Sequence, residues 1–286
     1  MPTLVKRILT GSLVVLLTIL AVYAADGMYV PVLFAVVMNV GLYEWQRLCK
    51  NMGFGIPVFW LFLLGNLAYF SLTLFFYEQT GNVIASALSM PAVWIMVAAM
   101  ASMFVWAVMK PEKGRWEKMW VRLGLVLAGV SYISVSLALL CFLSAPYQGG
   151  NPNILMGFFV MIWAADVFAY VVGSLLGKHK LCERLSPSKT WEGAIGGFVL
   201  ALIGGLLWFL FVLDGAMSLH SWMGMSALVV LCGMIGDLLE SKLKREAGVK
   251  DSGTILPGHG GILDRFDSVL LAAPVAVAFL HLIELF

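Results

Sequence analysis

Long apolar runs alternate with short polar connections along the whole chain. The runs cover residues 8–24, 28–46, 56–76, 88–109, 123–145, 152–176, 191–213, 220–239 and 267–285. Because a helix needs about 20 mainly apolar residues to cross the hydrocarbon core of a bilayer, the pattern predicts an all-α, polytopic membrane protein with nine transmembrane helices. Eight or ten spans stay open, since the run at 123–145 is long and Pro91 lies near the start of the fourth run. The first run is longer than the apolar part of a cleaved signal peptide, so we interpret it as a retained first span.

The basic residues lie only before the first run and in every second connection. These segments hold all 18 Lys and Arg residues, whereas the other connections contain only Asp26, Glu78 and Asp214 as charged residues. By the positive-inside tendency, the N-terminus and the even-numbered connections face the cytosol and the C-terminus lies outside. A wrong number of spans would mix the two kinds of connection, so the segregation supports the count.

Composition excludes an ordinary soluble domain. The chain is 61% hydrophobic and only 12% charged, against about 25% charged residues in a typical globular protein. Its formal net charge is +2, and no nucleic-acid partner is expected. The four cysteines are scattered without metal-ligand spacing, so we interpret them as apolar packing residues.

Acidic residues within the spans point to chemistry in the second half. Asp166 falls in the sixth span, Glu192 opens the seventh and Asp237 lies near the end of the eighth. A carboxylate at membrane depth costs about 2.5–3.5 kcal/mol on insertion scales and is a functional hypothesis by default, with structural pairing as the alternative. In the first half, the only acid within a span is Glu44, which we expect at headgroup level without a functional role.

The segments around Asp166 and Glu192 contain glycines at helical spacing, and the second also contains residues typical of a helix start. Asp166, Tyr170, Gly173 and Gly177 fall on one helical face, and the pairs Gly173/Gly177 and Gly193/Gly197 favour close helix packing. The segment 186–193 (SPSKTWEG) contains Ser and Thr residues typical of helix N-caps. Lys189 does not suit the positive end of a helix, so we expect a bound anion there.

The region 237–267 concentrates most polar chemistry. Asp237, Ser241 and Lys244 share a helical face, Lys244-Arg245 and Lys250-Asp251 follow, and a glycine-rich turn leads to Asp264. Carboxylates at facing helix ends could hold Mg²⁺, while glycine backbone groups and cations bind phosphate. A basic loop would explain the cations alone, but not the acids on both sides of the turn. The pattern favours a site for a nucleotide polyphosphate.

These residues resemble the signature of the phosphatidate cytidylyltransferase family. The match comprises SKLKR at 241–245, KDSG at 250–253 and LPGHGGILDRFD at 256–267. Asp166 with Tyr170 and Gly173, and the segment 186–193, resemble upstream blocks of that family. The resemblance covers about the last 130 residues, so we divide the chain into an N-terminal transmembrane bundle (1–150, the first five spans) and a catalytic transmembrane region (151–286) with cytosolic loops.

The resemblance implies a nine-span enzyme that converts CTP and phosphatidic acid to CDP-diacylglycerol and pyrophosphate in phospholipid biosynthesis. It implies Mg²⁺ at Asp237 and Asp264 and leaves open a second, monovalent cation such as K⁺. The expected location is a bacterial cytoplasmic (inner) membrane with the active site facing the cytosol. A homodimer is left open.

Roles for the site residues follow from the same resemblance. Asp237 and Asp264 would ligate the metal, and Lys244, Arg245, Lys250 and Arg265 would bind polyphosphate or the lipid headgroup. Asp251, Asp267 and Glu192 would support them or add ligands. Ser186, Lys189 and Thr190 would close the pocket, and Ser241, Gly260 and Gly261 would contact substrate. Asp166 would orient a lysine or ligate the second cation, and His259 would donate a proton to pyrophosphate or anchor the turn.

Two other functions compete with this one. A CTP-dependent transferase or kinase acting on another lipid, such as a polyprenol, would need the same polyphosphate chemistry. A transporter or channel would also place carboxylates in the membrane. Transporters tend to contain inverted repeats with sites at the midplane, whereas this chain shows no internal repeat and gathers its charges at one membrane face.

Overall fold

The computed structural model describes residues 3–78, 83–109, 116–144, 151–183, 185–213, 215–256, 258 and 260–284. His259, one of the predicted site residues, lies outside these ranges, as do residues 110–115 of the fourth connection.

Long helices account for nearly all of the described chain. They are α1 (Thr3–Tyr23), α2 (Val30–Asn51), α3 (Val58–Glu78), α4 (Val83–Met109), α7 (Pro152–Leu176), α8 (Trp191–Phe211), α9 (Leu219–Glu246) and α10 (Leu263–Glu284). The fifth predicted run is a continuous helical stretch made of α5 (Trp116–Gly129), the π-helical segment η2 (Val130–Val135) and α6 (Ser136–Ser144). A short 3-10 turn, η1 (Ala24–Gly27), follows α1. The all-α prediction is confirmed, and each predicted run corresponds to a long helical stretch.

Seven of the helical stretches in the described residues are long and apolar enough to cross a membrane. The other two are α1, whose apolar part covers Thr10–Tyr23, and α2, whose last turns carry Glu44, Arg47 and Lys50. The protein is therefore an integral membrane protein, while the count of nine spans stays a prediction. Tyr23 at the end of α1 donates a hydrogen bond of 3.0 Å to Asn153 of α7, so the first helix packs into the bundle.

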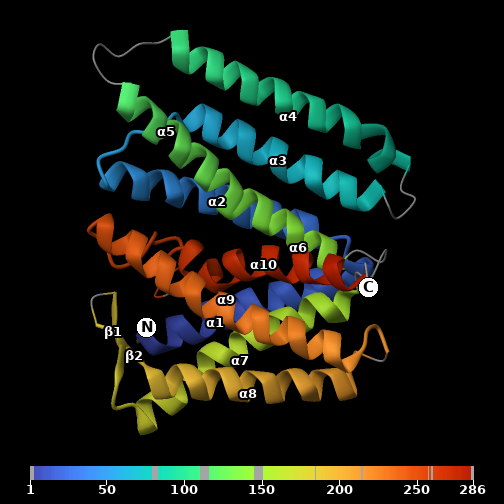
Figure 1. Ribbon diagram of the computed structural model, residues 1–286, viewed down its shortest axis with the longest axis vertical. Coiled ribbons are helices and arrows are strands. Elements are labelled where there is room, and N and C mark those ends of the chain that lie inside the picture. Colours follow the sequence, from blue (N-terminus) through green and yellow to red (C-terminus); the bar gives the residue numbers. More distant parts are fainter. Residues whose placement is uncertain are drawn as a thin grey trace.

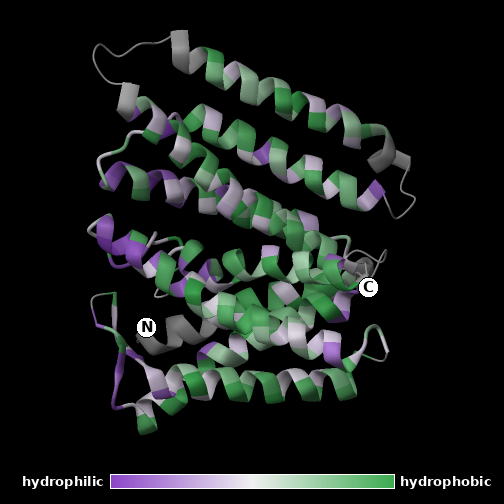
Figure 2. Ribbon diagram, viewed as in Figure 1, coloured by the Kyte–Doolittle hydropathy of each residue, from purple (hydrophilic) through white to green (hydrophobic). Residues whose placement is uncertain are grey.

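The helices lie side by side, with α4 at one edge next to α3 and α8 at the other edge next to α7 (Figure 1). The N and C marks lie toward opposite ends of the bundle (Figure 1). Hydrophilic residues gather at the end where α2 and α9 finish and α10 begins, and apolar residues cover the middle (Figure 2). This polarity agrees with the segregation of charged residues along the sequence.

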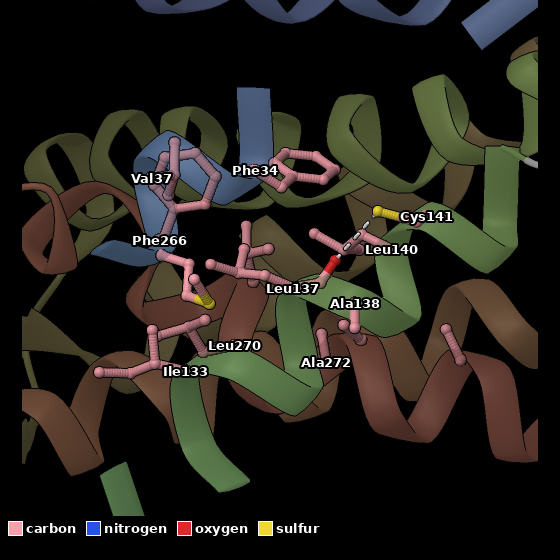
Figure 3. Packing of buried hydrophobic residues seen from close by; sticks show 14 of the residues in the cluster. Phe34, Val37, Ile133, Leu137, Ala138, Leu140, Cys141, Phe266, Leu270 and Ala272 are labelled. Carbon is pink, nitrogen blue, oxygen red and sulfur yellow. Dashed lines mark hydrogen bonds between the residues drawn. The ribbon is translucent and has the colours of Figure 1, made fainter. Parts of the chain in front are cut away.

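A buried cluster joins the first and second halves of the chain. Phe34 and Val37 of α2 pack near residues of η2 and α6 and near Phe266 and Leu270 of α10 (Figure 3). The Phe34 and Phe266 rings meet edge to face with their centroids 6.5 Å apart. The two predicted regions therefore share one hydrophobic core, and the start of α10 rests on helices from the N-terminal half.

Small residues bring α7 and α8 into close contact, as predicted. A Cβ atom on Gly193 would lie 2.7 Å from the Ala169 carbonyl oxygen, and one on Gly197 would lie 2.7 Å from the Ala165 carbonyl oxygen. Both separations are too short for any side chain. The close contact fixes the start of α8 against α7.

A two-stranded hairpin connects α7 to α8, which the sequence did not predict. Strand β1 (Lys180–Cys182) pairs antiparallel with β2 (Ser186–Thr190), with Lys180 opposite Thr190. Thr190 then caps α8, because its side chain accepts a hydrogen bond of 3.2 Å from the Gly193 N–H. The hairpin lies at the hydrophilic end of the bundle (Figures 1 and 2).

Candidate active site

A cavity of about 650 Å³ opens among α7, the hairpin, α8, α9, the following loop and α10. Ligand sites commonly have volumes of about 300–1,000 Å³. Its lining includes these polar residues: Asp166, Tyr170, Ser174, Ser188, Lys189, Thr190, Asp237, Lys244, Asp251, Asp264, Arg265 and Asp267. Five of them are aspartates, against three cationic side chains. The cavity thus has a formal excess of negative charge that one divalent cation would balance.

Asp237, near the end of α9, forms an ion pair with Lys189 of β2. Its other oxygen lies 3.5 Å from the Ser241 hydroxyl, one turn further along α9. The bound anion predicted beside Lys189 at the start of α8 stays a prediction. The anion that the structure shows beside Lys189 is the carboxylate of Asp237, which ties the hairpin to α9.

Asp264, in the first turn of α10, is held on all sides. Its Oδ2 atom accepts hydrogen bonds from the Ser252 N–H at 2.8 Å, the Gly261 N–H at 2.8 Å and the Ser252 hydroxyl at 3.0 Å. Its Oδ1 atom accepts a hydrogen bond of 2.6 Å from Lys244, whose ammonium group also lies 3.2 Å from Glu240. Charge-assisted bonds of this kind are the stronger class. The loop after α9 therefore wraps around one carboxylate.

Gly260 makes this wrapping possible. Its φ angle is +81°, and a Cβ atom there would lie 2.6 Å from Asp264 Oδ2. Both the backbone conformation and the close approach require glycine. The glycine-rich turn is thus built around Asp264, and its two predicted residues, Gly260 and Gly261, act on that carboxylate.

The arrangement fits a divalent cation that is completed by substrate. Within the described ranges, no three His, Cys, Asp or Glu side chains are placed to hold a metal ion by themselves. Mg²⁺ usually takes one or two carboxylates and fills its other positions with phosphate oxygens and water. Asp237 and Asp264 come from different helices and line one cavity, each beside a lysine. These two residues could hold such an ion.

Most of the other predicted residues lie in or around the cavity. Asp166, Thr190, Asp251, Arg265 and Asp267 are part of its lining, together with Lys189 and Lys244. Ser241, Gly260 and Gly261 do not line it but contact Asp237 or Asp264. Lys250 is exposed on the loop and Ser186 begins β2; neither belongs to the lining that the described residues form.

Two predicted residues fasten the hairpin instead of lining the cavity. Glu192 in the first turn of α8 accepts hydrogen bonds from the backbone N–H groups of Lys178 and His179, at 3.1 and 3.2 Å. It also lies 2.6 Å from Nδ1 of the His179 ring. Arg245 of α9 donates a bond of 3.4 Å to the Leu185 carbonyl. These contacts hold both ends of the segment that carries Lys189.

Glu44 is the residue that sequence reasoning missed. Its side chain is fully buried, and it accepts hydrogen bonds from Ser252 Oγ at 2.8 Å, Ile262 N at 2.9 Å and Leu263 N at 2.9 Å. These contacts give Glu44 a structural role in holding the loop after α9 and the start of α10, which the sequence analysis does not predict. A carboxylate within an apolar helix was itself the signal that could have found it.

Comparison with known proteins shows the family to which the chain belongs. Residues 5–283 match the model of the cytidylyltransferase family. A phosphatidate cytidylyltransferase of Pseudomonas aeruginosa is 32% identical over 277 residues, which cover 96% of each chain. One from Staphylococcus aureus is 50% identical over 117 residues, 41% of this chain and 45% of that protein. One from Staphylococcus haemolyticus is 43% identical over 151 residues, 52% of this chain and 55% of that protein. The chain belongs to the cytidylyltransferase family and is a nucleotidyltransferase.

Proposed function

We propose that this protein is a phosphatidate cytidylyltransferase, which transfers the cytidylyl group of CTP to phosphatidic acid. The observation that carries the proposal is that Asp237 and Asp264 line one cavity, each beside a lysine. The names of the relatives from Pseudomonas and Staphylococcus support the choice of lipid acceptor. The account would not hold if the two aspartates acted in separate places.

The reaction needs alignment and charge neutralisation more than a strong base. A phosphate oxygen of phosphatidic acid attacks the α-phosphorus of CTP and forms a new P–O bond. The bond between the α-phosphorus and the oxygen that bridges to the β-phosphate breaks, and pyrophosphate leaves with its electrons. The attacking phosphate already carries negative charge at neutral pH, because the second pKa of such a monoester is about 6. Holding the two phosphates in line supplies much of the rate enhancement.

Different residues in and around the cavity would bind the phosphates, hold the metal ion and keep its ligand in place. Lys189, Lys244 and Arg265 present cations to the polyphosphate, and a lysine ammonium can donate to a phosphate while it keeps one bond to its aspartate. Mg²⁺ held by Asp237 and Asp264 would bind phosphate oxygens and offset the charge that develops as pyrophosphate leaves. The backbone around Gly260 and Gly261 keeps Asp264 in place.

We place this cavity on the cytosolic side of a bacterial cytoplasmic membrane. Within the described residues, Lys and Arg gather near the end of α2, in the hairpin and at the end of α9, all at the hydrophilic end of the bundle where α10 also begins (Figure 2). That charge bias is typical of the cytosolic side. A cavity at this level lets CTP enter from water and phosphatidic acid enter from the membrane.

Radiolabelled CTP tests the proposal against its rivals. Purified protein receives CTP labelled at the α- or the γ-phosphate, with phosphatidic acid or a polyprenol as acceptor, with and without Mg²⁺. We expect α-label in lipid only with phosphatidic acid and Mg²⁺. Transfer of γ-label would identify a kinase, and labelling of polyprenol without labelling of phosphatidic acid would identify another lipid transferase. Either result would overturn the proposed function.

A further inference from the structure

One buried acid in the N-terminal half lies outside the cavity. Glu44 is on α2, near the hydrophilic end of the bundle, with none of its surface exposed. A buried carboxylate that lacks hydrogen bonds is strongly destabilising, so the groups that satisfy it show what it holds. Within the described residues, its hydrogen-bond donors are Ser252 of the loop after α9, and Ile262 and Leu263 at the start of α10.

Glu44 acts at the start of α10 as a cap supplied by another helix. Its two oxygens accept the Ile262 and Leu263 N–H groups, each at 2.9 Å, and α10 begins at Leu263. The first N–H groups of a helix have no partner within the helix, and the helix dipole favours an anion beside them. The position of α10 along its own axis is therefore set by a carboxylate of α2.

The loop is shaped to admit this carboxylate. A Cβ atom on Gly253 or on Gly261 would collide with Glu44 Oε1. Each glycine thus lets the backbone approach the carboxylate more closely than a residue with a side chain could. The loop that carries the glycine-rich turn closes around two acids, Glu44 on one side and Asp264 on the other.

Ser252 links the two acids directly. Its hydroxyl lies 2.8 Å from Glu44 Oε2 and 3.0 Å from Asp264 Oδ2, while its N–H donates to the same Asp264 oxygen at 2.8 Å. Gly261 donates its N–H to Asp264, and the next residue, Ile262, donates its N–H to Glu44. Glu44 and Asp264 are therefore linked in two ways, through Ser252 and through the adjacent N–H groups of Gly261 and Ile262.

We infer that Glu44 is a positioning residue for Asp264: it fixes the loop and the start of α10 so that Asp264 faces Lys244 and the cavity. The inference rests on the proposed function for its effect on catalysis, although the contacts themselves do not depend on it. Glu44 is not among the described residues that line the cavity. It acts through Ser252, Gly261 and the first N–H groups of α10.

Glu44→Gln is the sharpest substitution, because it keeps size and shape. The amide has one oxygen and one NH₂ group, so in either orientation an NH₂ group replaces an acceptor and faces the N–H of Ile262 or Leu263. The variant therefore disturbs the loop without leaving a cavity. Asn39→Ala is the matched control, since Asn39 lies on the same helix and hydrogen-bonds Asn66 of α3, away from the loop.

The experiment measures hydrogen exchange and activity on full-length protein in detergent. In Glu44→Gln, the peptide that contains Ile262 and Leu263 should exchange about tenfold faster or more, because its capped amides lose their acceptor. The Mg²⁺ concentration for half-maximal cytidylyl transfer should rise by about 10- to 100-fold, the usual effect of losing a residue that orients a metal ligand. Asn39→Ala should match wild type in both measurements.

Each outcome decides something. Unchanged exchange and an unchanged Mg²⁺ midpoint in folded Glu44→Gln would overturn the inference, as would equal changes in Asn39→Ala. If Glu44→Gln does not fold, Glu44→Asp replaces it: this variant keeps the charge but withdraws the carboxylate by one methylene from the N–H groups of Ile262 and Leu263, so it should still speed their exchange and raise the Mg²⁺ midpoint. A wild-type protein that labels no lipid would contradict the proposed function alone, because the exchange comparison uses no substrate.

Discussion

The two aspartates of the cavity lie in very different surroundings. Asp264 has only 4% of its side chain exposed, and four hydrogen bonds from Lys244, Ser252 and Gly261 reach it. Asp237 has 26% of its side chain exposed, with an ion pair to Lys189 and a long contact to Ser241. Both acids line the cavity, but Asp264 is fixed by the surrounding backbone, whereas Asp237 is held by few contacts.

Because their surroundings differ, the two aspartates should contribute differently to the stability of the fold and to the reaction rate. Changing Asp264 removes the acceptor for several buried donors, so it should lower both the free energy of unfolding and the rate. Changing Asp237 frees one lysine that is itself accessible, so it should lower the rate and leave the fold intact. A site with one fixed carboxylate and one adaptable carboxylate can keep its geometry while it accepts and releases a charged nucleotide.

The largest effect is expected for Asp264→Asn. Cytidylyl transfer should fall by at least about 100-fold, the scale of losing one key electrostatic stabiliser. The amide nitrogen will also face Lys244 or the N–H groups of Ser252 and Gly261, which should cost about 1–3 kcal/mol of stability. Turnover and thermal unfolding in detergent measure the two effects.

The matched control for that variant is Glu246→Gln. Glu246 lies on α9 in an exposed pair with Lys242 at 3.8 Å, a kind of contact worth little. It should behave as wild type in both assays. Near-normal turnover of Asp264→Asn would remove Asp264 from the proposed metal site.

Asp237→Asn should lower turnover by about 100-fold as well, because it removes the second proposed ligand. Its thermal midpoint should stay close to that of wild type, since the side chain is accessible and satisfies no buried backbone group. Parallel melting curves of the two Asn variants give the comparison. A loss of stability as large as that of Asp264→Asn would show that the two surroundings are equivalent, contrary to the account.

Lys189→Met should have a smaller effect, mainly on the binding of CTP. The KM for CTP should rise by about tenfold or more, since a charge-assisted contact contributes at least about 1.5 kcal/mol. Lys242→Met, an exposed lysine of α9 outside the cavity lining, is the control and should leave KM unchanged. Steady-state kinetics at saturating phosphatidic acid provide both values, and an unchanged KM in Lys189→Met would exclude this lysine from the nucleotide site.

The smallest effect on turnover is expected for a substitution of Gly260, which can be compared with Gly248 because both glycines have positive φ angles. Gly260 (φ +81°) lies against Asp264, whereas a Cβ atom on Gly248 (φ +68°) would meet no neighbouring atom within 4 Å. Left-handed backbone disfavours a side chain at either place, so alanine should cost about 1–2 kcal/mol of stability at Gly248 and more at Gly260, where its Cβ would also collide with Asp264. Only Gly260→Ala should also lower turnover, by several-fold. Equal turnover in the two variants would show that the turn does not position Asp264.

Much of the fold could be predicted from local sequence patterns. The run at 152–176 coincides with α7, and the run at 56–76 differs from α3 by two residues at each end. Apolar length and glycine spacing depend on neighbouring residues, so they can be read directly. The hairpin could not be predicted, because the segment 180–190 is short, polar and contains Pro187 within a strand.

The site could be predicted where its residues lie within one motif, and not where contact joins distant segments. The two acids that flank the glycine-rich turn do line one cavity with Lys244. Glu44 was missed because 208 residues separate it from Ser252, and no local pattern records that contact. The position of Lys189 at a helix start predicts a neighbouring anion. The carboxylate that lies beside it belongs to Asp237, 48 residues further along the chain, and no local pattern indicates that contact.

The central claim is that Asp237 and Asp264 bind one ion together, and a double-mutant cycle tests it most directly. Binding of Mn²⁺, measured by electron paramagnetic resonance in the presence of CTP, is compared in wild type, Asp237→Asn, Asp264→Asn and the double variant. If both residues ligate one ion, the double variant should lose little more affinity than either single variant, because residues that act as a unit are non-additive. Losses that add up fully would place the two aspartates in independent sites and contradict the account.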